Sequence, residues 1–112
     1  MIEFLTMEQE SALYKFVRVD LSNKYQMPID IEEAEIVVGM EGAFGGETIE
    51  EALKVRFFPK DAHVQWIENK IRADIHEFCY LNDIRITPSI VIEKDVWLGE
   101  IRYGLVYMNA QH

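Results

Sequence analysis

The residues most able to do chemistry gather in a glycine-rich stretch, Gly39 to Glu51, with the sequence GMEGAFGGETIEE. Glycines between an apolar run and a candidate helix start are typical of a loop that binds a phosphate. Their spacing, however, matches neither G-x-G-x-x-G nor G-x-x-x-x-G-K-[ST]. The stretch contains four glutamates and no lysine or arginine, so it would repel an anion. The sequence therefore argues against a phosphate site and predicts no cofactor.

A metal site is the next chemistry that clustered acids could support. If Asp30 opened an EF-hand loop, Ala34 would occupy its fifth position and Glu35 its sixth, where glycine is required. His76 and Cys79 lie three residues apart on an expected helix, but a zinc site usually needs four ligands. We predict no metal site, with an irregular carboxylate site as the alternative, and we expect Cys79 to be a small buried residue.

Asp20 is the best candidate for acid or base catalysis, because it falls close to the apolar stripe of an expected helix. A carboxylate in such a place is paired, solvated at the rim of the core, or held in a pocket. We expect Asp20 to lie at the rim and to pair with Lys24. If it instead faces a pocket with Tyr103 or Tyr107, the protein would be a small enzyme with its site near Asp20.

The charge of the chain is strongly asymmetric. The 112 residues carry a net charge of −9, and the interval between Lys24 and Lys54 holds eight acids and no basic residue. That interval carries nearly all of the net charge, since it contributes −8. Such a field repels nucleic acid and anionic membranes and attracts cations. We therefore predict a basic protein partner, no direct nucleic-acid binding and no membrane association, with a purely solubilising role of the acids as the alternative.

Phe44 is the only aromatic residue of the glycine-rich stretch and lies between Ala43 and two glycines. An exposed aromatic side chain amid acids resembles a binding hot spot with a charged rim. The alternative is that Phe44 folds back onto the core as a lid. The predicted partner-binding residues are Glu41, Phe44, Glu47, Glu50 and Glu51.

The elements that must position these residues begin with a helix. Thr6 and Gln9 form a capping box, and apolar residues then recur at helical spacing, which predicts a helix from about Met7 to Tyr25. It should end before Pro28, since the residue before a proline avoids helical geometry. The apolar positions of this helix are Leu13, Phe16, Val17, Leu21 and Tyr25.

Two strands are expected around the glycine-rich stretch. The first extends from Glu35 to Met40 around an apolar centre. Residues Thr48 to Glu51 form a second capping box, which predicts a helical turn near Thr48. Alternating apolar and basic residues then predict a strand from about Ala52 to Phe58.

The second half of the chain starts with a helix, because one apolar stripe continues over nearly twenty residues. Asp61 caps this helix, and Asn82 suits the left-handed position after it. Alternation then predicts strands, the first of them interrupted at Pro88. The expected elements are a helix from about Ala62 to Leu81, strands Ile84–Thr87 and Ser89–Glu93, a turn at Lys94-Asp95 and a strand from Trp97 to Met108.

The order helix, strand, strand, helix, strand, strand predicts an α+β fold. We expect a single two-layer domain over residues 1–112, with two helices packed on a mainly antiparallel sheet. The single cysteine cannot form an internal disulfide, and the first residues lack the basic start of a signal peptide, so we expect a cytoplasmic protein.

Three functions follow from these observations as hypotheses. The first is a small acidic protein, not an enzyme, that binds a basic protein as an inhibitor, an immunity-type partner or a mimic of nucleic-acid charge. The second is a structural or assembly subunit of a homo-oligomer or a phage particle, with its contact on the Tyr103 and Tyr107 strand or on the Trp97 surface. The third is the small enzyme with a site near Asp20.

Overall fold

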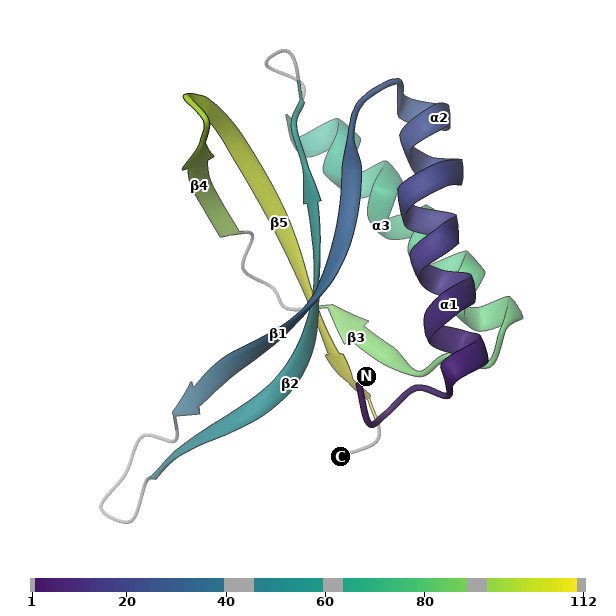
Figure 1. Ribbon diagram of the computed structural model, residues 1–112, viewed down its shortest axis with the longest axis vertical. Coiled ribbons are helices and arrows are strands. Elements are labelled where there is room, and N and C mark those ends of the chain that lie inside the picture. The colour runs from purple at the N-terminus through teal and green to yellow at the C-terminus, as the bar shows by residue number, and fades with distance from the viewer. Residues whose placement is uncertain (1, 40–45, 60–63, 89–92, 111–112) are drawn as a thin grey trace.

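Two helical stretches cover one face of a curled antiparallel sheet, which confirms the predicted α+β fold (Figure 1). The computed structural model describes residues 2–39, 46–59, 64–88 and 93–110. Along the chain, helical elements are followed by strands, a helix and further strands. The elements are α1 (Met7–Lys15), η1 (Phe16–Leu21), α2 (Ser22–Tyr25), β1 (Ile29–Gly39), β2 (Glu47–Phe57), α3 (Val64–Leu81), β3 (Ile86–Pro88), β4 (Glu93–Trp97) and β5 (Glu100–Asn109).

The strands follow the order β1-β2-β5-β3, and β4 also pairs with β5. β3 and β4 both lie along the edge of β5 that β2 does not occupy. The register shifts by two residues between them, since Pro88 faces Tyr107 whereas Glu93 faces Gly104. The predicted turn at Lys94-Asp95 is wrong, because both residues lie inside β4 and pair with β5.

One side of the sheet forms the core with the helices, because alternate residues of each strand point to the same face. Direct cross-strand neighbours such as Ile31 and Val55, or Val55 and Leu105, are all fully buried. The predicted burial of Cys79 is confirmed, and burial raises the pKa of its thiol to about 12. The largest buried members of the core are Leu13, Leu21, Ile31, Leu53, Phe57, Ile71, Ile75, Leu105 and Tyr107.

The first helix occupies the predicted range but widens into a π-helix at η1. Its capping box at Thr6 and Gln9 is present, as predicted. The apolar residues recur every four positions, and in a regular helix that spacing drifts by about 40° per step. Wider π turns offset this drift, so Val17 and Leu21, the two residues of η1 in this four-residue series, both stay buried against the core. The chain then turns at Gln26, which has a left-handed backbone with φ 51°.

The ribbon formed by β1 and β2 differs from the prediction in two ways. β1 begins at Ile29 rather than Glu35, because isoleucine and acid already alternate from Ile29 onward. The predicted helical turn near Thr48 is wrong, since Thr48 belongs to β2 and pairs with Val38. An isolated helical turn is costly to start, whereas this register continues an unbroken ladder of pairs with β1.

Helix α3 ends at Leu81, as predicted, and its predicted start at Ala62 lies outside the described residues. The side-chain amide of Asn82 donates to the Phe78 carbonyl oxygen at 2.8 Å. The left-handed residue after the helix is Asp83, with φ 54°, and not Asn82 as predicted. Asn82 instead serves as a side-chain cap, because its amide adds a second hydrogen bond to the Phe78 carbonyl, which also accepts from the Asn82 backbone N–H.

Candidate protein-binding site

The far ends of β1 and β2 project beyond the helices and form what we call the arm, residues 35–39 and 47–51 (Figure 1). The projection elongates the molecule to 46 Å along its longest axis. Its radius of gyration is 14.7 Å, whereas a compact chain of this length has about 13 Å. The arm therefore extends beyond the main body, and Glu51 at its base contacts the N-terminal segment.

An aliphatic pair lies exposed on the arm. Val37 and Ile49 face each other across the two strands, on the face that is buried further along the ribbon. Their exposed fractions are 62% and 68%, whereas Leu53 on the same face is fully buried. Paired large aliphatic side chains in such an exposed place mark a surface that can bury further area against a partner.

Next to the aliphatic pair, two glutamates face each other directly. Glu35 is the cross-strand partner of Glu51, and like charges in such a position destabilise a sheet. Glu51 also accepts a hydrogen bond from the backbone N–H of Glu3 at 2.9 Å, which offsets part of this cost. Both glutamates line a hollow of about 350 Å³ together with Ile2, Glu33 and Ala34. Its size and charge suit the side chain of an arginine or a lysine.

More acid surrounds the root of the arm. A hydrogen bond to Glu33 of β1 that forms when Glu10 of α1 is protonated, together with burial, raises the pKa of Glu10. The same hydrogen bond lowers the pKa of Glu33. Burial, followed by the charges of Glu10 and Glu33, raises the pKa of Tyr14 to about 12. The arm thus leaves the body through a strongly negative region.

The predicted partner-binding residues are only partly brought together. Glu41 and Phe44 lie outside the described residues, and only the backbone of Glu47 is described. Glu50 and Glu51 are consecutive residues of β2, so their side chains point to opposite faces of the ribbon.

The acidic hollow and the aliphatic pair were not predicted. The sequence does contain a signal for both features, namely the alternation that starts at Ile29. A predicted strand that began at Ile29 would have placed Glu33, Glu35 and Val37 on one face.

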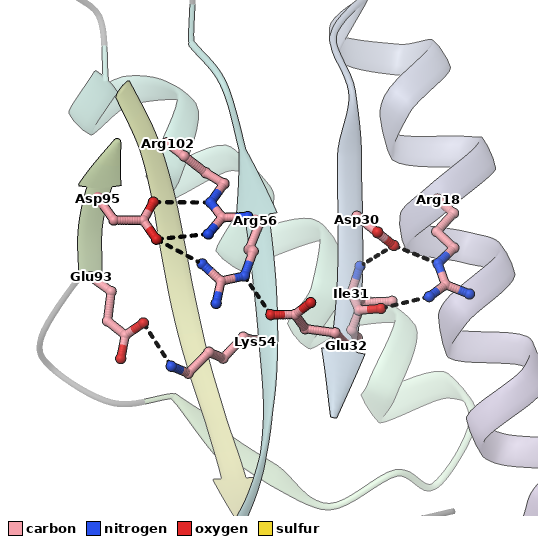
Figure 2. A network of polar contacts seen from close by, with 9 residues as sticks. All are labelled: Arg18, Asp30, Ile31, Glu32, Lys54, Arg56, Glu93, Asp95 and Arg102. Atoms are coloured by element: carbon pink, nitrogen blue, oxygen red, sulfur yellow. Dashed lines mark hydrogen bonds and ion pairs between the residues drawn. The ribbon is translucent and has the colours of Figure 1, made fainter. Parts of the chain in front are cut away.

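Acids on the open face of the sheet contact basic side chains, unlike Glu35 and Glu51 of the arm, which face each other. On the open face, away from the helices, Arg56 contacts Glu32 at 2.6 Å and Asp95 at 3.4 Å (Figure 2). Arg102 donates to both oxygens of Asp95, and the same arginine lowers the pKa of that carboxyl. Three half-buried cations on this face therefore meet three acids. The cations are Lys54, Arg56 and Arg102, and the acids are Glu32, Glu93 and Asp95.

Asp20 lines a groove of about 250 Å³ between the first helical stretch and α3. Phe16 and Phe78 stack at 4.3 Å and contribute to its apolar wall. Lys24 pairs with Asp74 at 2.9 Å, and not with Asp20 as predicted. The described lining residues of this groove do not include Tyr103 or Tyr107.

The two strand tyrosines lie on the helix-facing side of the sheet. Tyr103 is half-buried and stacks on Phe57 with ring centroids 5.9 Å apart. Tyr107 is only 1% exposed, and its hydroxyl has no hydrogen-bond partner among the residues that the structure describes. Tyr107 is therefore not available for contact with another molecule.

Comparison of the chain with protein-family models, with curated proteins and with solved structures gave no match. None of the described helices is both long and apolar enough to cross a membrane. Within the described ranges, no three potential metal ligands gather into one cluster. Inferences about function therefore rest on the geometry of this chain alone.

Proposed function

We propose that this protein acts by binding a basic protein partner through the arm of the β1–β2 ribbon. A cationic side chain of the partner enters the acidic hollow at the root of the arm. An apolar side chain of the partner covers Val37 and Ile49. Such a protein serves as an inhibitor, an immunity-type partner or a mimic of nucleic-acid charge.

One observation carries the proposal: the direct opposition of Glu35 and Glu51 beside an exposed aliphatic pair. Each feature lowers the stability or the solubility of the free protein. Opposed like charges cost roughly 0.2–1 kcal/mol per pair, and a bound cation converts that cost into attraction. A single partner surface that is both cationic and apolar relieves both features at once.

The arrangement favours a protein partner over nucleic acid, because every described ionisable side chain that lines the hollow is an acid. It also favours an arginine or lysine side chain over a free metal ion, since the described carboxylates of the hollow do not gather into a cluster that could hold a metal. Arginine is especially suited, because its planar guanidinium pairs with two carboxylate oxygens while its stem packs on apolar atoms.

A charge-reversal experiment tests the proposal. The double variant Glu35→Lys, Glu51→Lys should lose a basic partner that the wild-type protein captures from the lysate of its native host, as measured by quantitative mass spectrometry. Two lysines oppose each other in this variant as the two glutamates did, so its folding stability should stay close to that of the wild type.

The matched control is Glu8→Lys, Glu77→Lys, which changes the net charge equally at two exposed helix positions far from the arm in sequence. It should retain the partner. Binding should also weaken as salt increases, because exposed charges are screened. Retention of every captured basic protein by the arm variant, or equal loss in both variants, would reject the arm as the binding site.

A further inference from the structure

The hairpin that joins β4 to β5 ends in an unusual turn. Its two loop residues, Leu98 and Gly99, have φ values of 51° and 81°, which define a type I′ turn. Glycine or asparagine normally occupies the first of these positions, and a bulky side chain there is strained. Leu98 is also 89% exposed, more than any other large hydrophobic residue described. An exposed leucine in a strained position contributes nothing to folding, which directs attention to binding.

Leu98 lies within a larger apolar surface, which we call the tip. Trp97 and Ile101, which line the adjacent hollow together with Leu98, are both about half exposed. Val96, the cross-strand partner of Ile101, is exposed as well. Beside them is a hollow of about 640 Å³. Its lining residues are Pro28, Phe58, Pro59, Trp97, Leu98, Glu100 and Ile101. The tip therefore combines a protruding apolar side chain with an adjacent apolar hollow.

We infer that the tip is a homodimer interface, in which Leu98 of each protomer enters the hollow of a second copy of this chain. A twofold axis requires one surface that is complementary to itself. A knob and a hollow side by side satisfy this requirement, because the axis exchanges them. A different partner would need only one of the two features.

The area of the tip agrees with a dimer. The exposed parts of Trp97, Leu98 and Ile101, together with the walls of the hollow that they line, offer on the order of 500 Å² per protomer. Two copies would bury on the order of 1,000 Å², which is the lower bound for a specific interface. The dimer should therefore be weak, with a dissociation constant in the micromolar range.

The charge distribution is also compatible with a dimer formed through the tip. The arm and the tip lie at opposite ends of the longest axis, so contact between two tips keeps the two acidic arms apart (Figure 1). Next to the tip, Arg102 stacks on Trp97 at 4.8 Å and pairs with Asp95, so both signs of charge are present. A tip-to-tip dimer would also carry two arms that point in opposite directions, which allows bivalent binding.

Sedimentation equilibrium over a range of protein concentrations tests the inference. The wild-type protein should dimerise, and more strongly at high salt, because salt screens the repulsion between two negative protomers while the apolar contact persists. Leu98→Asn removes the knob but suits the I′ turn, so it should weaken dimerisation at least tenfold while raising the melting temperature. Loss of dimerisation therefore could not be attributed to misfolding.

The matched control is Leu81→Asn, which makes the same chemical change at another exposed leucine, 71% accessible, at the end of α3. It should leave dimerisation unchanged, as should the arm variant Glu35→Lys, Glu51→Lys. A monomer at every concentration and salt would overturn the inference and leave the tip to a different protein. Dimerisation that survives Leu98→Asn would also overturn it, because the contact would then lie elsewhere.

Discussion

The two halves of the β1–β2 ribbon share the same strands and the same ladder of cross-strand pairs, yet their surroundings are opposite. In the half near the helices, which we call the root half (residues 29–34 and 52–57), the inward face is buried in the core. In the arm, the corresponding face exposes Val37 and Ile49. The difference shows that continuous pairing alone does not determine how much a strand contributes to stability, because the contribution also depends on what packs against the faces of the strand.

The acids differ in the same way. Asp30 accepts a hydrogen bond from Arg18 and Glu32 contacts Arg56, so two of the three acids of the root half have cationic partners (Figure 2). The third, Glu33, interacts with Glu10. In the arm, Glu35 faces Glu51. The acidic interval that appears uniform in the sequence therefore contains both acids with basic partners, Asp30 and Glu32, and a pair of acids that face each other, Glu35 and Glu51. A cationic partner can stabilise the facing pair.

The largest expected difference between the halves concerns apolar side chains. Leu53→Ala in the root half should lower the free energy of unfolding by about 2–5 kcal/mol, because it leaves a cavity in a fully packed core. Ile49→Ala in the arm should lower it by less than about 1 kcal/mol, which reflects strand propensity alone. Denaturant unfolding measures both. Equal losses would show that the arm is packed as tightly as the body.

A smaller effect is expected from the cations of the open face. Arg56→Met should cost about 1–3 kcal/mol, because the side chain is largely buried and hydrogen-bonded to a carboxylate. The control Arg85→Met should change stability by less than about 0.5 kcal/mol, since its contact with Asp83 is exposed and 3.9 Å long. If the two substitutions cost the same, the network in Figure 2 does not stabilise the root half.

Glu10 and Glu33 at the root of the arm should make the folding stability depend on pH. The hydrogen bond with Glu33 and burial raise the pKa of Glu10, so the folded state binds a proton more tightly than the unfolded state. The resulting destabilisation is present at neutral pH and disappears as the pH falls through the raised pKa towards 4.5.

Glu10→Gln removes that destabilisation, because glutamine still donates a hydrogen bond to Glu33 but carries no charge. The variant should be more stable than the wild type at pH 7, by less than about 1 kcal/mol because the site is solvated. Its advantage should vanish near pH 4, as measured by thermal unfolding across that range. A constant advantage at every pH would contradict the repulsion between Glu10 and Glu33.

Much of the fold could be predicted from local patterns. The capping box at Thr6, the long stripe of α3 and the alternation of β5 each agree with a packing requirement, so pattern and structure coincide there. The predicted start of the last strand at Trp97 is wrong, because Trp97 ends β4 and Leu98–Gly99 form the turn before β5. The capping box at Thr48 failed for a physical reason. A cap stabilises a helix only if residues after it can bury a helical face, and here cross-strand pairing with β1 buries the same residues as a strand.

The candidate site could be predicted only in part. Negative charge along the interval was evident from composition, but the opposition of Glu35 and Glu51 depends on the register between two strands, which no local pattern encodes. The exposure of Val37 could not be predicted from the sequence either, because it depends on how far the helices extend along the sheet. Leu98 had a local signal, since a residue before Gly99 between two alternating segments is typical of a hairpin turn.

The proposed function rests on a contrast within the ribbon: Glu32 stabilises the root half through its ion pair, whereas Glu35 and Glu51 destabilise the arm by facing each other. The most direct measurement compares the free energies of unfolding of Glu32→Gln and Glu35→Gln, two neighbouring acids of β1 that undergo the same change. The two variants should change the free energy of unfolding in opposite directions. Glu32→Gln should lower it by about 0.5–1 kcal/mol, because the ion pair is lost. Glu35→Gln should raise it by about 0.2–1 kcal/mol, because the repulsion from Glu51 is relieved. A lower free energy of unfolding in both variants would contradict this contrast, because Glu35 and Glu51 would then not repel each other and a cationic partner would have no repulsion to neutralise.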